Sequence, residues 1–384
     1  MSTQPDNRFV DTRPYDPNAA LQELERKDLD APNWVLIWRK FKTHKLGLTS
    51  GVFLLICYLL LPVVGFIAPY GPNERDSEHI YSPPQSVNIF HNGELRAPFI
   101  YPMTSEADLE TFQWVFKPDL ENPQSLQYFC EGATYKIAGL IESNTHLFCA
   151  PEGATLFLWG SDRLGRDVFS RILYGAQLSL TVGLIGITVS FVLGIFFGSL
   201  AGYFGGKLDW TINRMIEILR SLPELPLWLA LSAAVPSNWS PVAVFFIISV
   251  ILGILDWPGL ARSVRAKFLS LREEEYVRAA EMMGASSGRV IRKHLLPNFM
   301  SHLIASAALS IPAMILGETA LSFLGLGLRA PAVSWGVMLN DAQNLASIEI
   351  YPWTAIPMLP IVVVVLAFNF LGDGLRDSLD PYQH

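Results

Sequence analysis

Six long apolar runs indicate that this chain folds in a lipid bilayer and not in water. Most of them approach or reach the roughly 20 residues that an α-helix needs to cross a hydrocarbon core about 30 Å thick. The composition agrees, because 51% of the 384 residues are hydrophobic and only 16% are charged. We therefore expect an all-α polytopic membrane protein with six transmembrane helices, at residues 46–68, 177–203, 223–236, 241–260, 299–324 and 354–371.

The third run is the shortest, and the stretch before it is charged. Arg214, Glu217 and Arg220 recur at spacings of three, which places them on one face of a helix. In a membrane, such a face turns to the bundle interior or to the lipid headgroups rather than to the lipid tails.

Residues 1–45 form a polar segment before the first run. This segment is far longer than the leader of a secretory signal peptide, so we expect the run 46–68 to remain as an anchor. One helical face of the segment is aromatic and apolar, which predicts a helix that lies in the interface and contacts membrane lipid. The residues on that face are Trp34, Ile37, Trp38 and Phe41. The alternative is a belt that only anchors the chain.

Lysine and arginine residues predict the orientation. They gather just before the first run and again within residues 262–293, whereas residues 69–160 are mainly acidic. Because positive charge favours the cytoplasmic side, we expect both termini, including the tail 373–384, to lie in the cytoplasm. The net charge of −7 then belongs largely to the outer segment. It does not indicate binding to nucleic acid.

Residues 69–160 are expected to form an extracytoplasmic insertion between the first two membrane helices. Short alternating pieces within it predict a small β-rich subdomain. Cys130 and Cys149 both fall here, and in an oxidising compartment they are expected to form a disulfide, with two free thiols as the alternative. No His or Cys cluster has metal-ligand spacing, so we expect neither a metal nor a cofactor on this chain.

Residues 161–175 follow the insertion. Leu164, Val168 and Ile172 fall on one helical face and the charged residues fall elsewhere. This pattern predicts an amphipathic helix that lies flat on the outer surface before the chain enters the membrane, with simple packing against the bundle as the alternative.

The sequence offers no catalytic motif. Residues 202–207 approximate a phosphate-binding loop, but Ala201 and Leu208 stand where that motif requires Gly and Ser or Thr. We therefore expect a chain that is not an enzyme.

A polar stretch, residues 275–298, separates the fourth and fifth runs. Its first part predicts a helix with a small, smooth face. Tyr276, Ala279, Ala280 and Met283 recur at helical spacing, and the two alanines form the small face. Gly284 permits a sharp turn, Ser286 or Ser287 can begin a second helix, and Pro297 is expected to end it. We expect a helix-turn-helix knob on the cytoplasmic side that fits a socket in a partner, with a solvated amphipathic connector as the alternative.

This stretch resembles the EAA loop of ABC importer permeases. In that loop Glu-Ala-Ala precedes a Gly by three residues, and nine more residues separate the Gly from Ile-X-Leu-Pro. Ala279, Ala280, Gly284, Leu296 and Pro297 match in register, whereas Arg278 stands at the Glu position and His294 at the Ile position. Further segments resemble signatures of the dipeptide/oligopeptide subfamily, at 160–175, 318–327, 331–336 and 366–381.

The resemblance implies a permease subunit of the bacterial inner membrane, with a core at 161–372 and a coupling loop at 262–298. It implies a second permease subunit, two ABC ATPase subunits that bind ATP and magnesium, and a periplasmic substrate-binding protein as partners. The ATPase-coupling residues would be Tyr276, Arg278, Ala279, Ala280, Met283, Gly284, Leu296 and Pro297. The implied solute is a di- or oligopeptide, with a metal complex or a glycoconjugate as the alternative.

Glu318 is an ionisable residue within the fifth run, toward its outer end. An intramembrane charge of this kind is a candidate for the translocation path, and a packing hydrogen bond to a neighbouring helix is the alternative. A secondary transporter subunit is the competing class of protein. It would require internal inverted repeats and paired ionisable groups, and the sequence shows neither.

Overall fold

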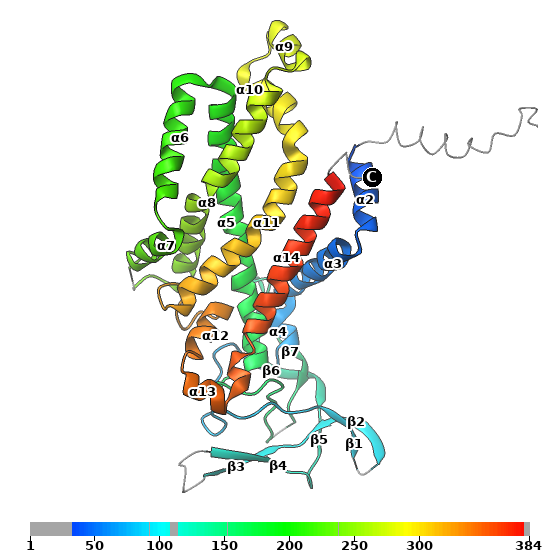
Figure 1. Cartoon of the computed structure of the whole chain (residues 1–384). Helices are drawn as coiled ribbons and strands as arrows, with labels where there is room; N and C mark the ends of the chain where they lie inside the picture. The colour runs from blue at the N-terminus through cyan, green and yellow to red at the C-terminus, as the bar shows by residue number, and fades with distance from the viewer. Residues whose placement is uncertain (1–32, 92, 108–113, 152, 237, 380–384) are drawn as a thin grey trace, which may run out of the picture.

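A computed structural model describes residues 33–379, except 92, 108–113, 152 and 237. Its long helices run together as a bundle, and the strands gather at one end of that bundle (Figure 1). The short helix α9 (Glu275–Met282) lies at the opposite end. The predicted segment 1–45 and the predicted tail 373–384 fall partly outside the described residues.

Five helical spans in the described part of the chain are long and apolar enough to cross a membrane. The first comprises α3 (Lys45–Leu60), η1 (Leu61–Val63) and α4 (Val64–Ile67), and α2 (Asn33–Thr43) precedes it. The next two are α5 (Val168–Phe204) and α8 (Pro241–Leu271). The fourth joins α10 (Ser287–Val290), η2 (Ile291–Leu295) and α11 (Leu296–Phe323), and the fifth joins η3 (Pro352–Ala355) and α14 (Met358–Leu379). The predicted polytopic α-helical architecture is confirmed.

The third predicted run differs, because it does not form one long helix. Helix α6 (Gly206–Ser221) is followed by α7 (Glu224–Ala233), and the extended backbone of Leu222 and Pro223 separates them. At 1.5 Å per residue, the 10 residues of α7 reach only about 15 Å, which is half of a hydrocarbon core. Helix α7 is therefore too short to cross a membrane without α6.

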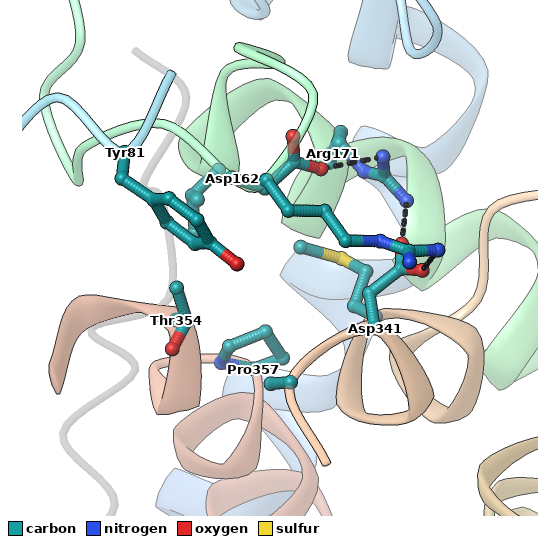
Figure 2. Close-up of a pocket in the computed structure, with 10 residues that line it drawn as sticks. Tyr81, Asp162, Arg171, Asp341, Thr354 and Pro357 are labelled. Atoms are coloured by element: carbon teal, nitrogen blue, oxygen red, sulfur yellow. Dashed lines mark hydrogen bonds and ion pairs between the residues drawn. The ribbon is translucent and has the colours of Figure 1, made fainter. Parts of the chain in front are cut away.

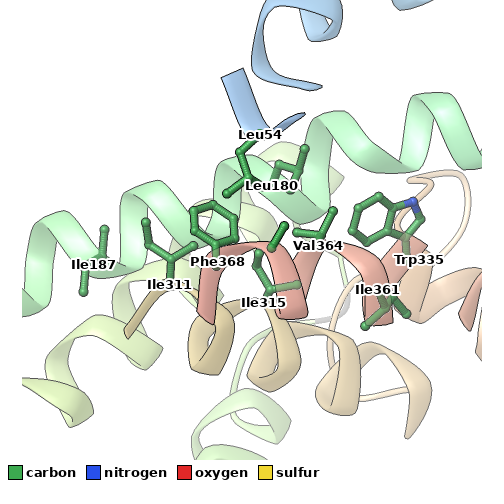
Figure 3. Packing of buried hydrophobic residues seen from close by; sticks show 10 residues of the cluster. Leu54, Leu180, Ile187, Ile311, Ile315, Trp335, Ile361, Val364 and Phe368 are labelled. Atoms are coloured by element: carbon green, nitrogen blue, oxygen red, sulfur yellow. The ribbon is translucent and has the colours of Figure 1, made fainter. Parts of the chain in front are cut away.

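Apolar side chains from four membrane helices meet in the centre of the bundle (Figure 3). Leu180 of α5, Ile315 of α11 and Phe368 of α14 are buried together with Leu54 of α3. Trp335 closes this cluster from α12 (Trp335–Asp341). The burial explains why the runs predicted from hydropathy pack as one body and not as separate helices in lipid.

Helices α5 and α8 approach each other closely along a row of glycines. A Cβ added to Gly198 would stand 2.6 Å from the carbonyl oxygen of Ala261, and Gly194 and Gly202 are similarly crowded by α8. Glycines four residues apart share one helix face, so their backbones can pack directly against a neighbouring helix. This contact fixes the position of α8, which leads into the polar loop.

The insertion is β-rich, as predicted, and all its strand pairs are antiparallel. One sheet has the order β1-β2-β5, and the pairs β3-β4 and β6-β7 form two further ribbons. The strands are β1 (Asn88–His91), β2 (Glu94–Ile100), β3 (Met103–Ala107), β4 (Trp114–Pro118), β5 (Gln124–Ser125), β6 (Gln127–Ile137) and β7 (Ile141–Cys149).

The β6-β7 ribbon is attached to the end of the first membrane span. His146 is fully buried, with Nδ1 2.6 Å from the carbonyl oxygen of Ala68 and Nε2 2.9 Å from that of Ala133. Cys130 and Cys149 are joined as a disulfide between the two strands, with their Cα atoms 6.2 Å apart. The insertion is therefore fastened both internally and to the membrane region.

The predicted surface helix at 161–175 is wrong. Residues 161–167 form a tight turn closed by a bridge between Ser161 and Asp167, and α5 begins directly at Val168. The Asp167 side chain accepts a hydrogen bond from the backbone N–H of Ser170 and so caps α5. The charged residues of this stretch were expected on the surface, but several are buried because oppositely charged residues pair with them.

Candidate functional site

The polar loop forms two short helices, α9 and α10, with a glycine between them. Helix α9 ends at Met282, and Gly284 adopts a φ of +83°, a conformation that favours glycine. Ser286 occupies the position before α10, as the sequence predicted, but its side chain makes no capping hydrogen bond. The turn therefore depends on Gly284 more than on a cap.

Burial divides the loop into an inner and an outer face. Val277 and Ala280 of α9 are buried against the ends of the long helices, and Val290 and Leu295 complete that inner face. The outer face carries Tyr276, which is 40% exposed, and Met282 and Met283, which are 89% and 82% exposed. Ala279 is also exposed. Exposed methionines that point away from the bundle are typical of a surface that receives a partner.

The role expected of Pro297 is corrected by the structure, because this residue does not end the second helix. Residues Ser287–Phe323 are one continuous helical span, and Pro297 lies in the first turn of α11. The preceding turn, Ile291–Leu295, is a π-helix in which the N–H of Leu296 donates to the carbonyl of Ile291. A wider turn accommodates a residue that lacks an N–H donor. The polar loop is thus directly continuous with a membrane helix.

Polar contacts tie the loop to the neighbouring helix ends. The Tyr203 hydroxyl, at the end of α5, donates to Glu281 at 2.6 Å, and Asn298 Nδ2 donates to the Tyr276 hydroxyl at 2.9 Å. Arg278 pairs with Glu273, an exposed residue just before α9. Of the sequence-predicted residues, Tyr276 and Arg278 thus have polar partners, and Ala279 and Met283 remain open to solvent.

Glu318 lies in the packed interior of the bundle. It is fully buried, and its Oε1 accepts hydrogen bonds from Ser322 at 2.7 Å and Ser334 at 2.8 Å. Ser179 of α5 stands 3.5 Å from its other oxygen. These contacts join α5, α11 and the start of α12, so the geometry favours the packing alternative over a position on the path.

A buried charge cluster at the strand-bearing end was missed by sequence reasoning. Arg166 contacts both Asp162 and Asp341 at 2.7 Å. Figure 2 shows Arg171, which contacts Asp162 at 2.8 Å. Arg163, the exposed member, pairs with Asp341 at 2.7 Å. Burial raises the pKa of Asp162, and Arg166 acts against that shift. The available signal was the dense run of Arg and Asp at 162–171, which we interpreted as an exposed face.

The described part of the chain holds no metal-binding cluster. Within residues 33–379, apart from the gaps named above, no group of three or more His, Cys, Asp or Glu side chains has a geometry that suits a metal ion.

Comparison with known proteins decides the family. A model described as the binding-protein-dependent transport system inner membrane component matches residues 194–383, and one described as the N-terminal TM domain of oligopeptide transport permease C matches residues 33–84. The dipeptide transport system permease protein DppC of Bacillus subtilis is 43% identical over 225 residues, which cover 58% of this chain and 68% of that protein. The chain belongs to this permease family.

Two other permeases extend the comparison. The oligopeptide transport system permease protein OppC of Haemophilus influenzae is 39% identical over 60% of this chain and 72% of its own length. The DppC permease of Lactococcus lactis is 30% identical over 345 residues, 90% of this chain and 89% of that protein. A match of that length must include most of the insertion, so the insertion has a counterpart in another permease of the family.

Among solved structures, an inward-facing conformation of the MetNI methionine ABC transporter covers 55% of this chain and 97% of its own, at 19% identity and a TM-score of 0.42.

Proposed function

We propose that this permease forms half of the translocation path of an ATP-driven importer for di- or oligopeptides. The observation that carries the proposal is the exposed methionine and tyrosine face of α9, which is continuous with the membrane span Ser287–Phe323. The similarity to permeases named for dipeptide and oligopeptide transport supports peptides over metal complexes or glycoconjugates.

The partners proposed are a second permease subunit, two ABC ATPase subunits and a periplasmic substrate-binding protein. The ATPase subunits would bind ATP and magnesium and hydrolyse the nucleotide, so this chain itself is not an enzyme. The complex would lie in the bacterial inner membrane, in contact with lipid, with both termini in the cytoplasm. Basic residues near the loop support that orientation.

The coupling step follows from the loop's connections. When the two ATPase subunits close on ATP, they would displace the exposed face formed by Tyr276, Met282 and Met283. Because α10 continues into α11 and Tyr203 links the loop to α5, the displacement would shift both helices together. The permease would thus alternate between states open to opposite sides of the membrane.

The test is to replace Met282 and Met283 with Asp and to measure co-purification of the ATPase subunits and ATP-driven peptide import. Charges in a desolvated contact should reduce both strongly, while the purified permease stays folded. Leu140→Asp is the matched control, because Leu140 is 85% exposed and lies on the insertion, at the other end of the molecule. If the two methionine variants retain the ATPase and import peptide as the control does, the proposed coupling face is wrong.

A further inference from the structure

A cavity of about 140 Å³ at the break between α6 and α7 carries charged side chains from three helices. Arg220 belongs to the last turn of α6, Glu224 to the first turn of α7, and Asp256 to α8. Apolar side chains, including Trp228 and Leu255, form the rest of the wall. The cavity is larger than a site for a single water molecule, and it is open on one side.

The charges lie at membrane depth. Asp256 is inside the apolar part of α8, and Arg262, six residues later, is the first basic residue of this helix. Six residues of helix correspond to about 9 Å. Ionisable side chains that far into a hydrocarbon layer are costly unless they face protein, water or a bound solute.

Arg220 and Glu224 are exposed and lie near enough to Asp256 to act on its charge, but neither makes a close polar side-chain contact within the part of the chain that the structure describes. Arg214 and Glu217, earlier on α6, form an ion pair at 2.9 Å, but Arg220 and Glu224 form neither an ion pair nor a side-chain hydrogen bond. Asp256 accepts one hydrogen bond, from Ser190 at 2.9 Å. The fold therefore leaves the cavity with charges that an external group can use.

The backbone prepares this arrangement. Gly259 leaves room for the Arg220 guanidinium beside α8, because a Cβ there would stand 2.9 Å from its Nη2 atom. Glu224 lies in the first turn of α7, where the partial positive charge of the helix end stabilises a carboxylate. Helices broken at membrane depth also expose backbone groups that can contact a solute.

We infer that this cavity is a subsite of the translocation path that receives the ammonium end of a peptide. Two carboxylates against one guanidinium give the cavity a net negative charge, which favours a cationic group over an anionic one. The inference rests on the proposed peptide function, and it places the path at Glu224 and Asp256 and not at Glu318.

The first test uses the assembled importer in vesicles. Glu224→Gln and Asp256→Asn should each slow import of a free tripeptide about tenfold at saturating binding protein, since each removes a charge-assisted contact. Association with the ATPase subunits should stay at the wild-type level, because neither residue is in the coupling loop. Glu217→Gln is the control on α6, because Glu217 pairs with Arg214 and does not line the cavity, and it should import normally.

The second test asks whether the cavity is aqueous and negative. In a Cys57→Ser background, Leu227→Cys, which lines the cavity and keeps all three of its charges, should react with a cationic methanethiosulfonate about tenfold faster than with an anionic one, after correction for their rates with a free thiol. Excess tripeptide should slow the reaction. Ile254→Cys, on the same helix as Asp256 but outside the cavity, is the control and should remain unreactive.

The outcomes separate the hypotheses. If Leu227→Cys is as unreactive as Ile254→Cys or shows no preference for the cationic reagent, or if both neutral variants import normally, the inference is overturned. It is equally overturned if the neutral variants separate the two permease subunits, because the charges would then pair across that interface. A wild-type complex that imports no tripeptide would overturn the proposed function itself, and this is measured before any variant.

Discussion

The two ends of this permease treat polar and apolar groups in opposite ways. At the strand-bearing end, Arg166 and Arg171 are buried against Asp162 and Asp341, and the disulfide closes the neighbouring ribbon. At the loop end, the charges are mostly exposed and two methionines project into solvent. The difference suggests a division of labour, in which one end preserves its own packing and the other end is completed by a partner.

The largest effect should follow from Arg171→Leu. It would leave Asp162 and Asp341 buried with less compensating charge, which costs about 3–5 kcal/mol of unfolding free energy. Thermal unfolding of the detergent-solubilised protein measures this loss. Arg163→Leu is the control, since its 54%-exposed side chain should contribute less than about 1 kcal/mol. Equal losses in the two variants would contradict the importance of burial at this end.

The next effect concerns the disulfide. Replacing both Cys130 and Cys149 with Ser should destabilise the insertion by about 3 kcal/mol, as expected for a closed loop of this length. Proteolysis of the insertion and thiol titration under denaturing conditions are the measurements. The unreduced wild-type protein should show one thiol, Cys57, and the reduced protein three. Three thiols without reductant would show that the two cysteines are free.

Glu318 tests whether the core near the strand-bearing end is structural. Glu318→Ala should cost about 2 kcal/mol, because three serine hydroxyls lose their shared acceptor. Glu318→Gln should be less damaging and should import peptide at nearly the wild-type rate. An import defect in Glu318→Gln that exceeds its loss of thermal stability would place this residue on the path.

The smallest effect on stability is expected at the loop. Gly284→Ala should cost about 1 kcal/mol, since alanine is strained at a φ of +83°. Gly288→Ala, a helical position with open space around the added Cβ, should be neutral or slightly stabilising. ATPase association should be measured together with stability. We expect Gly284→Ala to reduce ATPase association by a larger factor than its loss of unfolding free energy would explain. A loss of association in both variants would point to a surface effect and not to the turn.

Much of this architecture could be predicted from the sequence, and the exceptions have physical causes. Hydropathy identified the long spans because apolar length is the main requirement for crossing a membrane. It predicted a span at 223–236, but the helix there covers only Glu224–Ala233, because Pro223 separates it from α6. The β-rich insertion was recognised from alternation, but not its attachment through His146, which depends on contacts distant in sequence.

The candidate site was only partly predictable. Periodicity and the family resemblance located the loop, including Gly284, but they could not tell that Ala280 faces inward and Met282 outward. Charge pattern also misled us at Arg166 and Arg171, because a helical wheel does not show which charges find a buried partner. The same limitation hid the hydrogen bonds of Glu318, since its serine partners come from different segments of the chain.

The continuous span Ser287–Phe323 has a consequence for how motion is distributed. A push at Ser287, the end that adjoins the polar loop, acts on a lever of about 38 Å before Pro312 interrupts the backbone hydrogen bonds. Beyond that point, Glu318 pins the far segment to Ser179 and Ser334. The near two thirds of the helix should therefore swing while the last turns stay in place, so Pro312 would act as the pivot of the cycle.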